Sequence, residues 1–142
     1  MRPPIPVRQD FRSWTEEKLR NMDTDQFHHI NNSAMASFFE AGRMEVFSAP
    51  DVRQVIGSAS LAVVRLLINF HRELFYPRKV AVGSSVMRVG ERSFEFCQGL
   101  FDGEDCVASA EVVCVLLDSS TGRAQPIGEP LRNRLLSGRA VR

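Results

Sequence analysis

The sequence predicts an α+β fold, with one long helix early in the chain and an antiparallel sheet after it. Three observations support this prediction. Apolar residues repeat at helical spacing from Met35 to Val46. Alternating or β-branched segments fill most of residues 60–117, and turn signals such as Asp102-Gly103 separate them. Because a lone helix must bury its apolar face, we expect the sheet to curl around it.

Local signals place each element in order. A Pro-rich arm and a half-exposed strand come first, and three candidate N-cap residues then precede a helix that Ala49-Pro50 ends. Gly, Pro and Asp turns bound the later strands, one of which is apolar enough for burial on both faces. The elements are the arm 1–10, a strand 11–20, a helix from Asn32 or Ser33 to Ser48, a helical turn 51–57 capped by Asp51, strands 60–74, 80–89, 94–100, 106–117 and 123–126, and a helix 130–138 with Leu131, Leu135 and Leu136 facing inward.

The composition fits one domain of 142 residues with a substantial core. Hydrophobic residues make up 44% and charged residues 25%, and the formal net charge is +1. Nothing therefore indicates a nucleic-acid or membrane partner, since the longest apolar stretch is interrupted by Arg65 and Asn69. The N-terminus lacks the apolar segment of a signal peptide, which predicts a cytoplasmic protein.

Three cysteines, Cys97, Cys106 and Cys114, lie in strand-like segments. None forms a CxxC pair, and no histidine stands near them at the spacing of metal ligands. We therefore expect buried free thiols in a reducing compartment, with no metal and no redox cofactor.

One segment concentrates the polar side chains that can carry chemistry. Residues 23–32, Asp-Thr-Asp-Gln-Phe-His-His-Ile-Asn-Asn, hold two carboxylates, two imidazoles and two amides directly before the predicted helix. Free N–H groups and the dipole at a helix N-terminus favour negative charge. The segment is therefore suited to a carbonyl group that becomes an oxyanion.

The pattern D-T-D-x-x-x-H-x-N-N resembles the signature of the hotdog-fold acyl-CoA thioesterases, the 4-hydroxybenzoyl-CoA thioesterase-like family. The resemblance extends over roughly residues 13–134, because the later strand pattern fits as well. It implies a single hotdog domain, in which an antiparallel sheet wraps one long central helix. It also implies a homodimer or homotetramer, in which paired sheet edges are covered across a two-fold axis.

The resemblance implies roles for the loop residues. Asp25 matches the family's catalytic acid, and it would act as nucleophile or as general base. The structural alternative is that it caps the helix or stabilises the loop by accepting backbone hydrogen bonds. Asp23 is expected to hydrogen-bond to backbone. His29 matches the motif histidine, which belongs to the catalytic set of the related plant acyl-carrier-protein thioesterases. It would orient water or substrate, or bridge the loop to a partner subunit.

Two positions depart from the family pattern, and two lie at the helix start. His28 replaces a usual Gly, which supplies positive φ or close approach to substrate, and its side chain narrows the entrance. Phe27 replaces the Asn of the plant enzymes. The Asn32 N–H would donate to the thioester oxygen, while capping is the structural role open to Asn31 and Asn32. Phe27, His28 and Asn31 are expected to contact substrate.

Further residues complete the expected site. Glu73 lies in a segment similar to the strand that supplies a catalytic Glu in the plant enzymes, so it is a possible second carboxylate; a surface Glu beside Arg72 is the alternative. Glu40, on the helix, is expected to form a structural ion pair with an Arg. An acyl or aryl group would lie between helix and sheet against Phe38 and Phe39, although core packing alone would bury both. The candidate cations for CoA phosphates are Arg78, Lys79, Arg88 and Arg92.

These residues together predict an acyl-CoA thioesterase that releases a free acid and CoA without a cofactor. Two alternatives remain open. One is hydrolysis of acyl carrier protein thioesters. The other is a non-catalytic hotdog module that binds acyl-CoA or a protein partner, which the departures at Phe27 and His28 favour. A hotdog dehydratase is disfavoured, because the chain lacks that family's His and Pro-Gly-x-Pro stretch.

Overall fold

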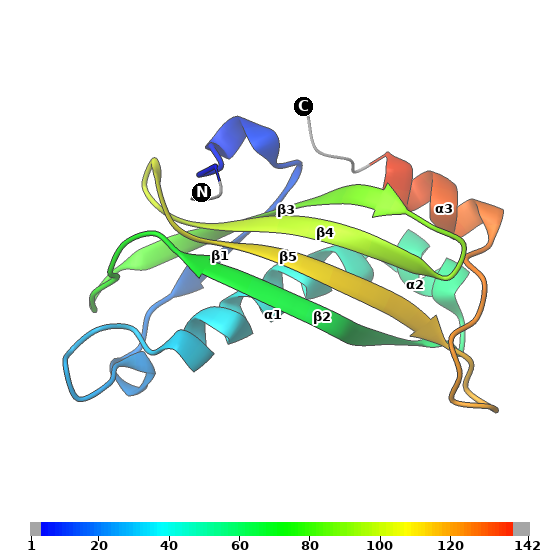
Figure 1. Cartoon of the computed structure of the whole chain (residues 1–142), viewed down its shortest axis with the longest axis horizontal. Coiled ribbons are helices and arrows are strands. Elements are labelled where there is room, and N and C mark those ends of the chain that lie inside the picture. Colours follow the sequence, from blue (N-terminus) through cyan, green and yellow to red (C-terminus); the bar gives the residue numbers. More distant parts are fainter. Residues whose placement is uncertain (1–3, 138–142) are drawn as a thin grey trace.

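The computed structural model describes residues 4–137, in which a five-stranded antiparallel sheet carries one long helix on one face (Figure 1). The strand order β1-β3-β4-β5-β2 makes β1 and β2 the two edges. The predicted α+β hotdog architecture is therefore confirmed. The strands are β1 (Ser13–Lys18), β2 (Ser60–Phe70), β3 (Lys79–Val89), β4 (Ser93–Asp102) and β5 (Asp105–Leu117), the helices are α1 (Asn32–Phe47), α2 (Pro50–Ile56) and α3 (Glu129–Leu136), and two 3-10 turns are η1 (Arg8–Asp10) and η2 (Asn21–Asp23).

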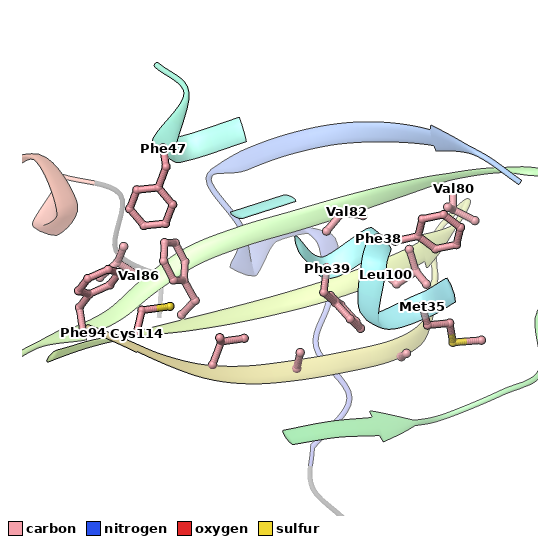
Figure 2. Packing of buried hydrophobic residues seen from close by; sticks show 14 of the residues in the cluster. Met35, Phe38, Phe39, Phe47, Val80, Val82, Val86, Phe94, Leu100 and Cys114 are labelled. Carbon is pink, nitrogen blue, oxygen red and sulfur yellow. The ribbon is translucent and has the colours of Figure 1, made fainter. Parts of the chain in front are cut away.

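Helix α1 packs on the sheet through an apolar face. Its core residues pack with inward side chains of β3, β4 and β5 (Figure 2). At Gly42 the helix comes so close to β3 that an added Cβ would lie 2.5 Å from Val82 Cγ1. A glycine is therefore needed at this contact. The core residues that α1 contributes are Met35, Phe38, Phe39 and Phe47.

The other face of the sheet has a smaller apolar cluster beneath the N-terminal arm. Gly83 and Gly99 are cross-strand partners, and their missing side chains leave a trench. The Phe11 side chain fills this trench, because an added Cβ would lie 2.8 Å from it at Gly83 and 2.9 Å from it at Gly99. Trp14 and Phe101 stand edge-on to Phe11, with ring centroids 6.0 and 5.8 Å away. The arm is thus tied to the sheet.

The prediction was wrong for the first strand, for the end of β2 and for the last strand. The first strand begins only at Ser13, because the residues before it include a 3-10 turn. Strand β2 ends at Phe70 rather than at residue 74. In the described chain the last predicted strand is reduced to an isolated bridge at Ala124, since Pro126 has no N–H group with which to continue the pairing.

The shorter helices also differ from the prediction in detail. Asp51 does not cap α2, because the helix begins at Pro50 and Asp51 lies in its first turn. Leu136 of α3 is 36% exposed, whereas the other two leucines predicted to face inward are buried. Gly138, the predicted last residue of that helix, lies outside the described residues. Over the described residues, no helix is both long and apolar enough to span a membrane.

Candidate active site

The loop before α1 is closed by its own backbone. The Asp25 N–H donates to the His29 carbonyl oxygen at 2.8 Å, and the His28 N–H donates to the Asp25 carbonyl oxygen at 3.1 Å. His28 adopts φ 69° in this turn, in the left-handed region. That conformation explains why glycine is usual at this place in the motif, and histidine is one of the other residues that adopt it.

The Asp25 carboxylate is held at one oxygen and open at the other. Its Oδ1 accepts the N–H groups of Phe27 at 2.8 Å and of His29 at 3.1 Å. Within residues 4–137 its Oδ2 has no hydrogen-bond partner, and the residue is half-buried. The loop therefore fixes one oxygen and leaves the second available to water or substrate.

Asp23 organises the loop, as expected for a residue that hydrogen-bonds to backbone. Its carboxylate accepts the Arg20 backbone N–H at 2.8 Å and the Arg20 guanidinium at 3.0 Å. Burial raises the pKa of this carboxyl, but the hydrogen bonds and charge of Arg20 outweigh burial and leave the pKa below its usual value. The Asp23 carbonyl also accepts the Asn31 N–H at 2.7 Å, which joins the two ends of the loop.

The structure brings Glu73 to this loop from the segment after β2. Glu73 Oε1 lies 3.5 Å from His29 Nε2, and an isolated bridge links His29 to Phe75. The Phe75 ring stands edge-on to the imidazole, with 5.0 Å between ring centroids. Arg72, the sequence neighbour of Glu73, pairs with Asp105 at 2.7 Å. Glu73 is therefore free to orient the His29 ring.

The first turn of α1 leaves an N–H group free directly after the loop. Asn31 caps the helix, because its Oδ1 accepts the Ser33 N–H at 2.8 Å and the Ser33 hydroxyl at 2.7 Å. The Asn32 N–H donates no hydrogen bond within the described chain, and Asn32 is exposed. A free N–H at the positive end of a helix dipole can stabilise an oxyanion.

The other predicted substrate contacts lie in two environments. Phe27 is 67% exposed and His28 is also exposed, so both stand on the surface of the loop. Phe38 and Phe39 lie on the buried face of α1 (Figure 2), where they pack with the sheet. Their contact with substrate stays a prediction.

The ion pair predicted for Glu40 is absent among the described residues. Glu40 is exposed, and no basic side chain lies within ion-pair distance of it. Arg43, one helical turn later, is instead buried and donates to Gln98 Oε1 at 3.1 Å. Sequence reasoning missed Arg43 and also Phe75, whose only signal was its place in an aromatic pair after a strand.

Of the four cations suggested for CoA phosphates, three have protein contacts, and Arg88 is exposed and forms no ion pair among the described residues. Arg78 and Lys79 form ion pairs with acidic residues, and Arg92 donates to a backbone carbonyl. All three cysteines are free, and burial raises the pKa of the Cys106 and Cys114 thiols to about 11. These two thiols are therefore protonated near neutral pH and poor nucleophiles. Residues 4–137 contain no group of His, Cys, Asp and Glu that could hold a metal ion.

A sheet wrapped on one long helix, with this polar loop at the helix start, defines the hotdog class of thioesterase-like proteins. Residues 19–135 match the family model of the thioesterase-like superfamily, and the chain belongs to that superfamily. No curated protein gave a match.

Solved structures agree with this fold. The chain is similar to a predicted thioesterase from Bacillus stearothermophilus, with 26% identity, a TM-score of 0.80, and coverage of 89% of this chain and 96% of that one. It is also similar to a thioesterase from Thermus thermophilus complexed with coenzyme A and Zn, with 24% identity, a TM-score of 0.80, and coverage of 90% and 94%. A protein from Pseudomonas aeruginosa gives 21% identity, a TM-score of 0.86, and coverage of 97% and 99%.

Proposed function

We propose that this protein is a thioesterase that hydrolyses acyl-CoA to a free acid and CoA. The observation that carries the proposal is the Asp25 carboxylate, anchored at Oδ1 and open at Oδ2, just before a helix with a free Asn32 N–H. Membership of the thioesterase-like superfamily supports thioester chemistry. The coenzyme A bound to the Thermus thermophilus relative supports CoA as the carrier. Water is the only co-substrate that this hydrolysis needs.

The residues act on the thioester in sequence. The carbonyl oxygen accepts the Asn32 N–H, and the dipole of α1 stabilises the negative charge that develops there. As nucleophile, Asp25 attacks the carbonyl carbon and expels the CoA thiolate, and water hydrolyses the resulting mixed anhydride. As general base, Asp25 instead takes a proton from the water that attacks. His29, oriented by Glu73, positions this water or the substrate.

Thiol release from short-chain, medium-chain, long-chain and aromatic acyl-CoAs tests the proposal. Asp25→Asn keeps the size of the side chain and an oxygen for the loop N–H groups, but removes the charge. We expect kcat to fall by about 10²–10⁴-fold, the range for a general acid or base, with an unchanged circular dichroism spectrum. Asp51→Asn is the matched control, because Asp51 forms an ion pair with Arg134 away from the loop. Full activity in Asp25→Asn would contradict the proposal.

Two alternatives give different results in the same assay. If the protein hydrolyses an acyl carrier protein thioester faster than the CoA thioester with the same acyl chain, its substrate is the carrier protein thioester. The reaction mechanism would then be unchanged. Binding of acyl-CoA without turnover would indicate a non-catalytic module, for which the 67% exposure of Phe27 is the supporting observation.

We also propose a homodimer, or a homotetramer built from it, that forms through strand β2. This edge strand exposes 61% of Val64 and 39% of Leu67, and its outer backbone groups are unpaired in the sheet. Such an edge favours pairing with a second copy. Sedimentation velocity should show the oligomer, and Leu67→Glu should shift it toward monomer; a monomeric wild type would contradict the proposal. The free thiols support a cytoplasmic location.

A further inference from the structure

Arg43 is a buried cation whose only direct hydrogen bond in the described chain goes to an amide. The residue is 5% exposed, and its Nη1 donates to Gln98 Oε1 at 3.1 Å. Gln98 is fixed in place, because its Nε2 donates to the Phe39 carbonyl oxygen at 2.8 Å and to Ser84 Oγ at 2.9 Å. Among the described residues no carboxylate lies within ion-pair distance of Arg43.

Arg43 lines a cavity of about 300 Å³ between α1 and the first half of β2. Every side-chain nitrogen or oxygen that is fully buried in the described chain has a hydrogen-bond partner. The Arg43 nitrogens that have no partner are therefore not fully buried, and Arg43 lines this cavity. Its other walls are mostly apolar and include Phe47, Leu61, Val63 and Cys114.

An apolar strip on β2 leads from the loop to this cavity. Val63, Leu66 and Phe70 point toward the helix side of the sheet, because their cross-strand partners on β5 belong to the core. They are nevertheless 45%, 42% and 48% exposed, so α1 leaves them uncovered. Phe70 ends β2 next to the segment whose Leu74 carbonyl accepts the Ile30 N–H of the loop. The strip therefore runs along β2 from the cavity toward the segment that pairs with the loop.

The positive charge of the Arg43 guanidinium favours a negatively charged ligand in the cavity. Desolvation lowers the pKa of Arg43 and outweighs the opposite effects of Cys114 and Glu40, so the net effect of the surroundings disfavours its charge. A carboxylate placed against it would compensate that charge with short, charge-assisted hydrogen bonds. Glu40 also lines the cavity and its charge raises the pKa of Arg43, but it is exposed to water and lies beyond ion-pair distance of the guanidinium.

We propose that this cavity binds the far end of the acyl group, and that Arg43 pairs with a carboxylate there. The substrate class is then the CoA monothioester of a dicarboxylic acid. This inference rests on the proposed thioesterase function. From Asn32 to Arg43 the helix advances roughly 16 Å at about 1.5 Å per residue, and the arginine side chain leans back toward the helix start. At about 1.2 Å per bond in an extended chain, an acyl group of roughly eight to twelve carbons spans about 10–14 Å and fits within this distance.

Three thioesters of one chain length test the inference: decanedioyl-CoA, decanoyl-CoA and ω-hydroxydecanoyl-CoA. In the wild type, kcat/KM for decanedioyl-CoA should exceed that for each of the others by about tenfold or more. Arg43→Met should reverse the preference for decanedioyl-CoA over decanoyl-CoA. Ser37→Ala, an exposed change on the same helix, should keep the wild-type ratio. Because the readout is a ratio, a general loss of activity does not imitate it.

Several results would overturn the inference. The first is a ratio of kcat/KM for decanedioyl-CoA to decanoyl-CoA that is near one in the wild type. The second is a ratio that Arg43→Met leaves unchanged. The third is a kcat/KM for ω-hydroxydecanoyl-CoA equal to that for decanedioyl-CoA. If Arg43→Met and Glu40→Gln both dissociate the oligomer while the ratio stays constant, the cavity belongs to an interface with a second copy. Turnover of all three thioesters without discrimination would overturn only this inference, and the proposed function would stand.

Calorimetry separates the two proposals when no thioester is hydrolysed or when Arg43→Met does not fold. Wild-type protein is titrated with decanedioate and with decanoate, which requires no catalysis. Binding of decanedioate at least about tenfold tighter supports the carboxylate site even if the proposed reaction fails. Equal affinities, or no binding of either acid, would overturn the inference.

Discussion

Replacing Gly42 with alanine should destabilise the protein, although alanine is the better helix former. The added methyl carbon would lie 2.5 Å from Val82 Cγ1, 2.9 Å from Gln98 Nε2 and 3.0 Å from Ser84 Oγ. Carbon atoms in good contact are about 3.5–4.0 Å apart, so α1 must move away from β3 by about 1 Å. Val82 is β-branched and fully buried, and it has little freedom to turn aside.

The magnitude follows from three contributions. Overpacking of a core costs about 1–3 kcal/mol. Displacing Gln98 weakens its hydrogen bonds to the Phe39 carbonyl and to Ser84, which adds about 1 kcal/mol. The higher helix propensity of alanine offsets about 1 kcal/mol. We therefore expect the free energy of unfolding to fall by about 1–3 kcal/mol.

Urea denaturation followed by circular dichroism measures this change. Ser37→Ala is the control, because Ser37 is exposed on the same helix, and it should alter the free energy of unfolding by less than about 0.5 kcal/mol. A Gly42→Ala protein as stable as the wild type would refute the reasoning that Gly42 sets the distance between α1 and the sheet.

Substitutions at three further positions test the loop and the outer face. The pKa of Asp23 is lowered in the folded state, so its stabilisation is complete above the unfolded pKa of about 3.9 and is lost as the pH falls below it; urea unfolding should show Asp23→Asn costing more stability at neutral pH than at about pH 3. His28→Gly should change Tm by only about 2 °C and His28→Val should lower it clearly by calorimetry, because valine resists φ 69°. Phe11→Ala should lower the free energy of unfolding by about 3–5 kcal/mol in urea, and a loss below about 1 kcal/mol would show that Phe11 does not fill its trench.

The sequence sufficed for the elements whose signals are local and periodic. Helix α1 could be predicted because Met35, Phe38 and Phe39 recur at helical spacing, and Asn31 proved to be its N-cap. The strands could be predicted because alternation and turn residues are properties of neighbouring positions. The candidate loop could be located because its polar residues are adjacent in the chain.

Contacts between distant segments could not be predicted in the same way. Glu73 and Phe75 reach His29 only because the segment after β2 folds back to the loop, and no pattern near either residue specifies that contact. The position of Glu40 in an otherwise apolar helix predicted that it would need an ion-pair partner, but α1 turns Glu40 toward water and Arg43 inward. Which side of a charged helix is buried depends on how the helix lies on the sheet.

The Phe11 trench has a consequence for where the folding unit begins. The stretch that matches the superfamily model starts at Leu19, after strand β1 and after Phe11. A fragment that begins at Leu19 would lack the edge strand β1. Strand β3 would then become a long exposed edge, which favours aggregation. The truncation would also empty the trench over Gly83 and Gly99. The smallest stable unit is thus longer than the stretch that matches the superfamily model, and it includes Phe11.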